Sequence, residues 1–398
     1  MHSGTTGSAP RPYHRNNEIE VLRAFAILFT VVLHLKLLLP AGNELKGWLG
    51  HLDLSIGVDL FLVISGYVIT VSVVNARQHY SGPTSALIFA FWIKRIYRLW
   101  PSAWAWVAVA VVSQLCLSAF TDMGFAPGDV ARQALAAMLN LMNLYTPHCV
   151  ATGNGLPCIF DNFLGHYWSL SLEEQFYILF PLLFFFLPRR VFVGVLVVAI
   201  ALQSMWSRPF FTYAWYFKTD ALCWGILLAL LQQSPVYSRV YSSRYLPKLL
   251  LRVAGLALVF TSPVWAAMVQ GIGYDMKPYG VALVALMCAG LVWLASLERG
   301  AFQFSSAIES VMLWFASRSY SMYLVHLIVF LTVRDGFAAA GFDLAYAANN
   351  DMAAIVTVVT ALGLTALLTE LNYRYVESGL RDRGRALASK RLKLAQEQ

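Results

Sequence analysis

Two ionisable residues lie on one apolar stretch near the N-terminus, and their spacing favours chemistry inside a membrane. The stretch runs from Ile19 to about Pro40 and is mostly Leu, Val, Ile, Phe and Ala, which is typical of a membrane-spanning helix. Within it, Arg23 and His34 are eleven residues apart. Eleven residues of helix rise roughly 16 Å and turn about three times, so both side chains share one face. Because an ionisable side chain inside a membrane costs roughly 2.5–3.5 kcal/mol to insert, we interpret the pair as functional.

Two adjacent carboxylates open a later apolar segment. Glu173 and Glu174 lie one to two turns inside the span predicted at 167–187, so both cannot face lipid. The predicted topology puts this end of the span on the same side of the membrane as His34. A histidine and a carboxylate on one side favour a general base with an orienting acid. Either glutamate is a candidate for that acid.

A compact group of cations lies in the connection predicted between the second and third spans. Lys94, Arg95 and Arg98 are flanked by aromatic rings, and the two arginines are three residues apart, which places them on one helical face. Arginine binds phosphate through two parallel hydrogen bonds, so this group favours a phosphate site at the inner surface. The alternative is an ordinary basic anchor with an aromatic belt.

Further polar residues lie inside apolar segments. Asp59, in the segment Gly57–Tyr67, either supports a polar cavity together with Ser65 or caps its helix. His326 lies in the middle of a span, one turn after Tyr323, and either takes part in the site or packs through a hydrogen bond. We add three residues near the carboxylates as candidates for substrate contact or structural support: Trp168, Ser171 and Tyr177.

The composition indicates an all-α integral membrane protein. Of the residues, 59% are hydrophobic and 13% charged, whereas soluble domains carry about 25% charged residues. The net charge of +8 falls mostly in short connections and tails, so it predicts membrane orientation and no nucleic-acid partner. No metal site is predicted.

Hydropathy predicts about ten spans, and alternate connections are rich in Lys and Arg, so we expect both termini in the cytoplasm. We expect a flexible N-terminal tail at 1–17, a transmembrane domain at 18–378 and a basic cytoplasmic tail at 379–398. Residues 129–145, in the longest connection, are expected to form one short amphipathic helix on the membrane. The predicted spans are 19–40, 54–74, 101–120, 167–187, 191–207, 216–232, 249–270, 279–297, 310–331 and 352–375.

Two of the five cysteines, Cys149 and Cys158, lie nine residues apart in a connection rich in Gly and Pro. In an oxidising compartment they would form a disulfide; the alternative is two unpaired thiols. The other three lie in apolar runs and are expected to pack as small hydrophobic residues.

Taken together, these segments resemble the acyltransferase 3 family of integral membrane acyltransferases, which act on bacterial glycans, Nod factors and macrolides. The resemblance covers residues 17–378 and depends on four elements, with Ser319–His326 as a weaker fifth. The chain resembles the members that stand alone, without a C-terminal hydrolase-like domain. The four elements are Arg23 with His34, Gly57–Tyr67, Arg95 with Arg98 and Pro101, and Trp168–Tyr177.

The resemblance implies transfer of an acyl group, usually acetyl, from cytoplasmic acyl-CoA to an acceptor hydroxyl in the bacterial inner membrane. Arg23, Lys94, Arg95 and Arg98 would bind the nucleotide phosphates. The pantetheine arm is about as long as the rise from Arg23 to His34, so the thioester would reach His34 as general base. Glu173 or Glu174 would orient His34, and a covalent acyl-histidine is an open alternative.

The acceptor is expected to be a cell-surface glycan such as O-antigen of lipopolysaccharide or a lipid-linked oligosaccharide, on family frequency alone. The main alternative function is a multi-span transporter or flippase that uses the buried His and Glu as a proton relay. The absence of visible inverted repeats in the sequence counts against it.

Overall fold

Helices make up all the regular structure in the part of the chain that the computed structural model describes. That part comprises residues 16–40, 42–120, 126–154, 158, 162–235, 237, 247–270, 279–341 and 351–397. Most of the expected N-terminal tail, residues 1–15, therefore lies outside it. The elements are α1 Asn17–Leu35, η1 Lys36–Leu38, α2 Glu44–Gly50, α3 Ile56–His79, α4 Thr84–Phe120, α5 Pro127–Met138, α6 Met142–Cys149, η2 Val150–Asn154, α8 Tyr167–Phe186, α9 Arg189–Met205, α10 Tyr213–Tyr216, α11 Thr219–Leu231, α13 Lys248–Gln270, α14 Gly280–Ser296, α15 Ser306–Ala339, α16 Asp351–Asn372, η3 Tyr373–Glu377 and α17 Ser378–Leu394.

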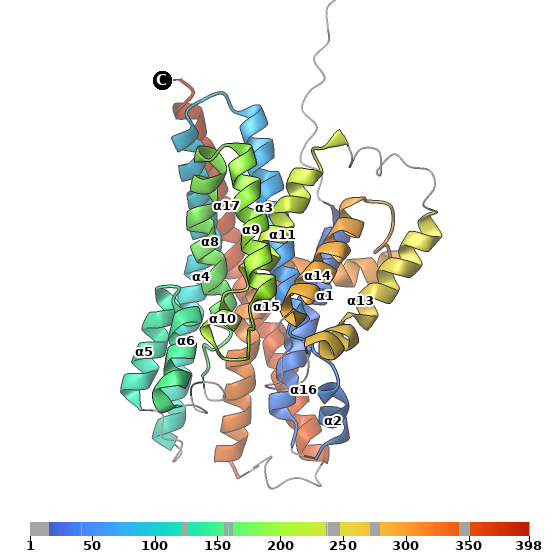
Figure 1. Cartoon of the computed structure of the whole chain (residues 1–398). Coiled ribbons are helices and arrows are strands. Elements are labelled where there is room, and N and C mark those ends of the chain that lie inside the picture. The colour runs from blue at the N-terminus through green and yellow to red at the C-terminus, as the bar shows by residue number, and fades with distance from the viewer. Residues whose placement is uncertain are drawn as a thin grey trace, which may run out of the picture.

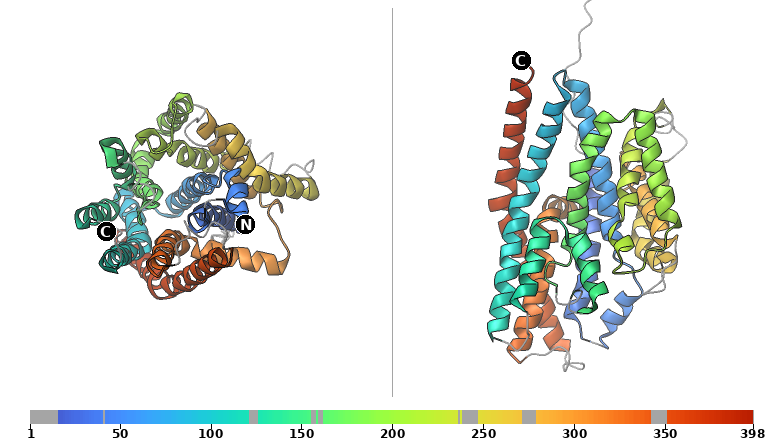
Figure 2. Two further views of the ribbon diagram at one scale, coloured as in Figure 1. Left: turned by 90° about the horizontal axis from the view of Figure 1, so that it is seen from below. Right: turned by 60° about the vertical axis from the view of Figure 1, so that its left-hand side comes forward.

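The protein is an all-α integral membrane protein with a bundle of long helices (Figure 1). Within the described ranges, eight helical segments are long and apolar enough to cross a membrane. Two further helices, α9 and α14, have 17 residues each and coincide with the short spans predicted at 191–207 and 279–297. Each predicted span overlaps one long helix of the structure, and the spans 19–40, 216–232 and 352–375 also include part of η1, α10 and η3, respectively. α1 and α3 lie near the centre of the bundle and the other long helices surround them (Figure 2, left).

The contact between α3 and α11 explains how the centre packs so closely. A Cβ atom added to Gly66 would lie 2.3 Å from the carbonyl oxygen of Leu222, and one added to Gly225 would lie 2.1 Å from that of Val63. The two helix backbones therefore touch where both residues lack a side chain, as is common where small residues let membrane helices approach.

The prediction of a loop at Phe91–Pro101 is wrong. These residues belong to α4, a continuous helix of 37 residues that contains Pro101. At about 1.5 Å per residue it is roughly 55 Å long, well beyond the roughly 30 Å hydrocarbon layer. The charges of Lys94, Arg95 and Arg98 interrupt the apolar run but not the helix.

The segment at 379–398, expected as a basic tail, is mostly helix α17. It continues α16 through the π-helical turn η3 and lies beside the N-terminal half of α4 (Figure 2, right). Gly384 permits the contact, since a Cβ there would lie 2.5 Å from Cβ of Tyr97.

The long connection contains two helices, α5 and α6, rather than the single helix expected at 129–145. Asn140 separates them with φ of 55°, a left-handed conformation that breaks a helix and that Asn tolerates better than most residues. Cys149 and Cys158 form a disulfide, so the first of the two alternatives is confirmed. Of the other cysteines, Cys223 and Cys288 are buried as expected, whereas Cys116 is exposed on the bundle surface.

Candidate functional site

A cavity opens among α1, α3, α4, α8 and α15, and predicted site residues line it. It contains about 790 Å³ of space free of protein atoms, part of it open to solvent. Its lining follows α3 from Val58 to Ile69, which corresponds to roughly 16 Å of helix. The polar lining residues are Arg23, Ser65, Arg95, Arg98, Ser169, Glu173, Tyr177, Ser319, Tyr320 and Tyr323.

One end of the cavity is cationic. Arg98 interacts electrostatically with both Arg95 and Arg23, so three guanidinium groups from α1 and α4 converge there. Arg23 forms an ion pair with Glu20 at 2.9 Å. No carboxylate in the described ranges lies within 4.0 Å of Arg95 or Arg98, and the Nε atoms of both are buried without a hydrogen-bond partner. Such unpaired cations inside a protein favour an anionic ligand.

Lys94 belongs to the same group of charges but does not line the cavity. It interacts electrostatically with Arg95 on α4 and with Arg385 on α17. The structure therefore brings all four predicted phosphate-binding residues to one end of the bundle, and adds a residue of α17 to them.

The two adjacent glutamates face different neighbours. Glu173 lines the cavity beside Ser65 and Tyr177, whose hydroxyl groups lie 2.9 Å apart, and it interacts electrostatically with Arg95. Glu174 accepts a hydrogen bond from Nε1 of Trp100 at 3.0 Å. Consecutive helix positions are about 100° apart, which explains why only Glu173 lines the cavity.

His34 belongs to a cluster of three histidines beyond the other end of the cavity. Its Nδ1 lies 2.9 Å from the carbonyl oxygen of Thr30 and 3.1 Å from Nε2 of His326. The rings of His326 and His166 are 5.2 Å apart. The hydrogen bonds of His34 in the described part of the chain go to these partners, and neither Glu173 nor Glu174 is among them.

The hydrogen-bond network assigns the tautomers of this cluster. Nδ1 of His326 lies 2.8 Å from the carbonyl oxygen of Tyr323 and 3.1 Å from that of Met322, so it must carry a proton. In the neutral ring, Nε2 of His326 is then an acceptor, and Nδ1 of His34 is the donor to it. This leaves Nε2 of His34 unprotonated, with a lone pair and no hydrogen-bond partner among the described residues.

A serine and a tyrosine separate the cavity from the histidine cluster. Ser169 Oγ lies 2.6 Å from the hydroxyl of Tyr323, which donates to the carbonyl oxygen of His166 at 2.6 Å. Both side chains line the cavity, whereas His34 does not. The ring of Tyr323 is 5.7 Å from that of His326, so the cavity reaches the residues next to the cluster.

Two other predicted residues, Ser171 and Trp168, have structural contacts. Ser171 donates to the carbonyl oxygen of Tyr167 and accepts from the backbone nitrogen of Met142, which joins α8 to α6. The ring of Trp168 packs edge-on against Tyr216 at 5.2 Å. Neither Trp168 nor Ser171 lines the cavity, whereas Tyr177 does.

Asp59 does not cap α3, so that alternative is wrong. It is fully buried and forms an ion pair at 3.0 Å with Lys218, which is also buried. A second buried pair lies nearby, where Arg208 holds Asp220 through two hydrogen bonds of 2.9 and 2.7 Å. A buried charge is stabilised by an opposite partner, and Asp59 and Lys218 are 159 positions apart, so spacing along the chain does not reveal their pairing.

The sequence did not reveal that His166 is buried or that His326 contacts His34. His166 follows a connection rather than an apolar run, which hid its burial: it is 3% exposed. His326 was a candidate, but its contact with His34 joins residues 292 positions apart, so only the fold reveals it.

The sequence profile described as an acyltransferase domain matches residues 16–370. The chain belongs to the acyltransferase 3 family. It is 28% identical over 389 residues to the O-acetyltransferase OatA of Staphylococcus aureus strain NCTC 8325, a match that covers 92% of this chain and 57% of OatA. A putative O-acetyltransferase of S. aureus strain COL is 26% identical over 393 residues, with the same coverage. The chain thus spans a little over half the length of these relatives. No solved structure gave a significant match.

Proposed function

We propose that this protein is a membrane O-acetyltransferase that moves an acetyl group from cytoplasmic acetyl-CoA to a hydroxyl of a cell-surface glycan. The observation that carries the proposal is one cavity with three arginines at one end and the histidine cluster just beyond the other. Two of these arginines, Arg95 and Arg98, have no carboxylate within 4.0 Å among the described residues. The printed names of the relatives, O-acetyltransferase and putative O-acetyltransferase, support the acetyl group and the hydroxyl acceptor.

The donor would enter from the cationic end. Arg23, Arg95 and Arg98 offer charge-assisted hydrogen bonds to the diphosphate of the nucleotide. The apolar and hydroxyl-bearing walls of the cavity suit the pantetheine arm, whose length is similar to the roughly 16 Å of helix that the lining follows. The thioester would then lie near Tyr323 and Ser169, next to His34.

His34 would act as the general base through its unprotonated Nε2. It takes the proton of the acceptor hydroxyl as the oxygen attacks the thioester carbonyl, and the carbon–sulfur bond breaks as the tetrahedral intermediate collapses. The proton on His34 then passes to the leaving thiolate, so no charge accumulates over the cycle. His326 would hold the ring of His34 by accepting, at its Nε2, a hydrogen bond from the Nδ1–H of His34, as an orienting residue does in a triad.

Glu173 has a different place in this proposal from the one expected. It faces the cavity between the arginines and Tyr323, where it would contact the donor rather than His34. Glu174, bonded to Trp100, would hold α8 against α4.

The orientation follows from the charge distribution. Lys and Arg residues gather at the end that carries Arg95, Arg98 and α17, so this end would lie in the cytoplasm of a bacterium, with both termini there. The histidine cluster would then lie in the outer half of the inner membrane, within reach of an extracytoplasmic acceptor such as a lipid-linked oligosaccharide or O-antigen.

The first test is acetyl transfer from radiolabelled acetyl-CoA into the glycolipid fraction of membranes that contain the wild-type chain, His34→Ala or His79→Ala. His79 is an exposed histidine at the end of α3 and serves as the matched control. We expect label with the wild type and the control, and loss of label with His34→Ala at equal expression. Label retained in His34→Ala would refute the base. A protein that moves glycolipid across the membrane without consuming acetyl-CoA would instead be a flippase.

A further inference from the structure

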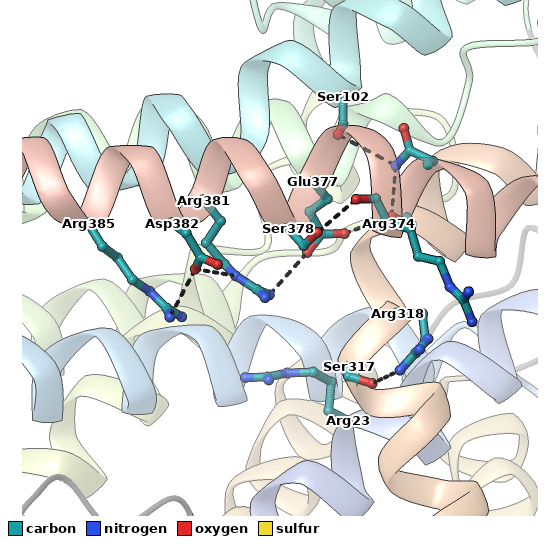
Figure 3. Close-up of polar contacts among 12 residues, drawn as sticks. Arg23, Ser102, Ser317, Arg318, Arg374, Glu377, Ser378, Arg381, Asp382 and Arg385 are labelled. Atoms are coloured by element: carbon teal, nitrogen blue, oxygen red, sulfur yellow. Dashed lines mark hydrogen bonds and ion pairs between the residues drawn. The ribbon is translucent and has the colours of Figure 1, made fainter.

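The C-terminal helix α17 is held at the cationic end of the cavity by a buried polar anchor. Asn372 donates to Ser321 at 2.7 Å, and Ser321 donates to Glu377 at 2.7 Å. Figure 3 labels Glu377 at the start of α17. Glu377 is 1% exposed and is the last residue of η3, immediately before α17. The anchor therefore fixes where the first turn of α17 begins relative to α15.

The rest of α17 is fixed along α4. Gly384 touches Tyr97, Ala388 is fully buried, and the guanidinium of Arg391 lies 4.6 Å from the ring centre of Phe89. These contacts use one face of the helix. They hold α17 against the N-terminal half of α4.

Arg381 and Arg385 are one turn apart on α17 and lie on the side that carries Arg23. In Figure 3 the guanidinium group of Arg381 extends from α17 toward the side of the view on which Arg23 lies. Arg381 lies 3.7 Å from Glu377, and Arg385 lies 3.4 Å from Asp382.

These groups and the arginines of the cavity form a closed ring of ion pairs and like-charge electrostatic interactions. Arg98 interacts with Glu377 as well as with Arg95 and Arg23. Glu377 and Asp382 both lie within 4 Å of Arg381, and Asp382 also forms an ion pair with Arg385. Arg385 in turn interacts with Lys94, and Lys94 with Arg95. The ring thus joins the cations on α4 to those on α17.

Ordinary structural arginines in this protein look different. Arg318 and Arg374 share Glu370, which satisfies both of them directly (for Arg318, at 2.9 Å). In the ring, by contrast, Arg381 and Arg385 have only loose carboxylate contacts of 3.4–3.9 Å, and Nε of Arg381 is buried without a hydrogen-bond partner. Guanidinium groups in such a state remain available to a stronger anion, and phosphate is the anion that their geometry fits.

We propose that α17 completes the donor site, with Arg381 and Arg385 binding the 3′-phosphate of the coenzyme while the cavity arginines bind its diphosphate. This inference rests on the proposed function, since it deepens the account of the donor. A donor with a diphosphate and a separate phosphomonoester presents two anionic groups, and the ring presents two connected groups of cations. α17 is thereby a specificity element that distinguishes coenzyme A from nucleotides without a 3′-phosphate.

The test is equilibrium binding of coenzyme A and of 3′-dephospho-coenzyme A to the full-length protein in nanodiscs of a neutral lipid. The variants are Arg381→Gln/Arg385→Gln and, to keep the charge, Arg381→Lys/Arg385→Lys. The matched control is Arg383→Gln, an exposed arginine on the same helix. Melting temperatures measured alongside show whether each variant is folded.

We expect the wild type and Arg383→Gln to prefer coenzyme A by at least about tenfold, as the loss of charge-assisted hydrogen bonds would predict. The Gln variant should bind both ligands with the weaker affinity, and the Lys variant should recover part of the preference. Equal binding of both ligands by the wild type would overturn the role of α17 and leave the proposed function standing, whereas no binding of either would overturn both.

Anionic lipid headgroups carry the same phosphate chemistry and are the competing occupant. Repeating the measurement in nanodiscs that contain phosphatidylglycerol distinguishes the two sources. If the preference for coenzyme A is retained by the Gln variant, and only the melting temperature in phosphatidylglycerol changes, α17 binds lipid and the proposal is wrong.

Discussion

The buried pair Asp59–Lys218 allows a quantitative test of whether a predicted site residue is structural. The two side chains are 0% and 1% exposed and their charged atoms lie 3.0 Å apart. With an effective dielectric constant of about 20, two charges at this distance attract by about 5–6 kcal/mol, most of which offsets the cost of desolvating them. Removing one partner leaves the other charge buried and uncompensated.

We therefore expect Lys218→Met to lower the free energy of unfolding by about 3–5 kcal/mol, and Asp59→Leu to do the same. Methionine keeps the apolar stem that packs on Trp215, whose ring centre is 3.6 Å from Nζ of Lys218. The double variant Asp59→Leu/Lys218→Met should be close to the wild type, which makes the coupling energy at least about 3 kcal/mol.

The assay is thermal and denaturant unfolding of the purified protein in one detergent, with acetyl transfer measured on the same samples. If Asp59 is structural, the double variant regains activity together with stability. A double variant that is stable but inactive would give Asp59 a role in substrate binding. The reasoning is refuted if the stability loss of the double variant equals the sum of the losses of the two single variants, since the two charges would then not stabilise each other.

Three further outcomes follow from the packing and the covalent structure. Gly225→Ala should destabilise the protein by about 1–3 kcal/mol because its Cβ would meet the backbone of α3, whereas Gly290→Ala, with nothing within 4 Å, should be neutral or stabilising in the same unfolding assay. Maleimide should label Cys149 and Cys158 only after reduction, as judged by mass spectrometry; labelling before reduction would contradict the disulfide. Arg208→Met should cost about 3–5 kcal/mol through the unpaired Asp220, and Arg208→Met/Asp220→Leu should recover most of that loss.

Hydropathy was sufficient to locate the long apolar helices, because their apolar runs are long enough to cross a membrane. It failed where charge enters a helix. Arg95 and Arg98 interrupt the apolar pattern and suggested a loop, yet α4 continues through them. The same difficulty hid α17, whose composition is that of a tail and whose order comes from Gly384 and Glu377.

The site was predictable only to the extent that one helix determines it. The spacing of Arg23 and His34 predicted that both side chains share one face of α1, and Arg23 lines the cavity. The expected partner of His34 was a carboxylate, because the sequence shows which residues are buried but not which of them meet. The fold brings His326 to His34 and turns Glu173 toward the arginines. Neither contact leaves a trace in the spacing of residues along the chain.

The hydrogen bonds of Tyr323 also bear on the electrical integrity of the membrane. A chain of hydroxyl groups that joined the two aqueous phases would conduct protons and dissipate the gradient that drives ATP synthesis. Here the hydrogen-bond chain from Ser169 through Tyr323 ends on the carbonyl oxygen of His166, which accepts a hydrogen bond but has no proton to donate. We therefore expect this chain of hydroxyl groups to stop at the carbonyl oxygen of His166 and not to provide a proton path between the cavity and the histidine cluster.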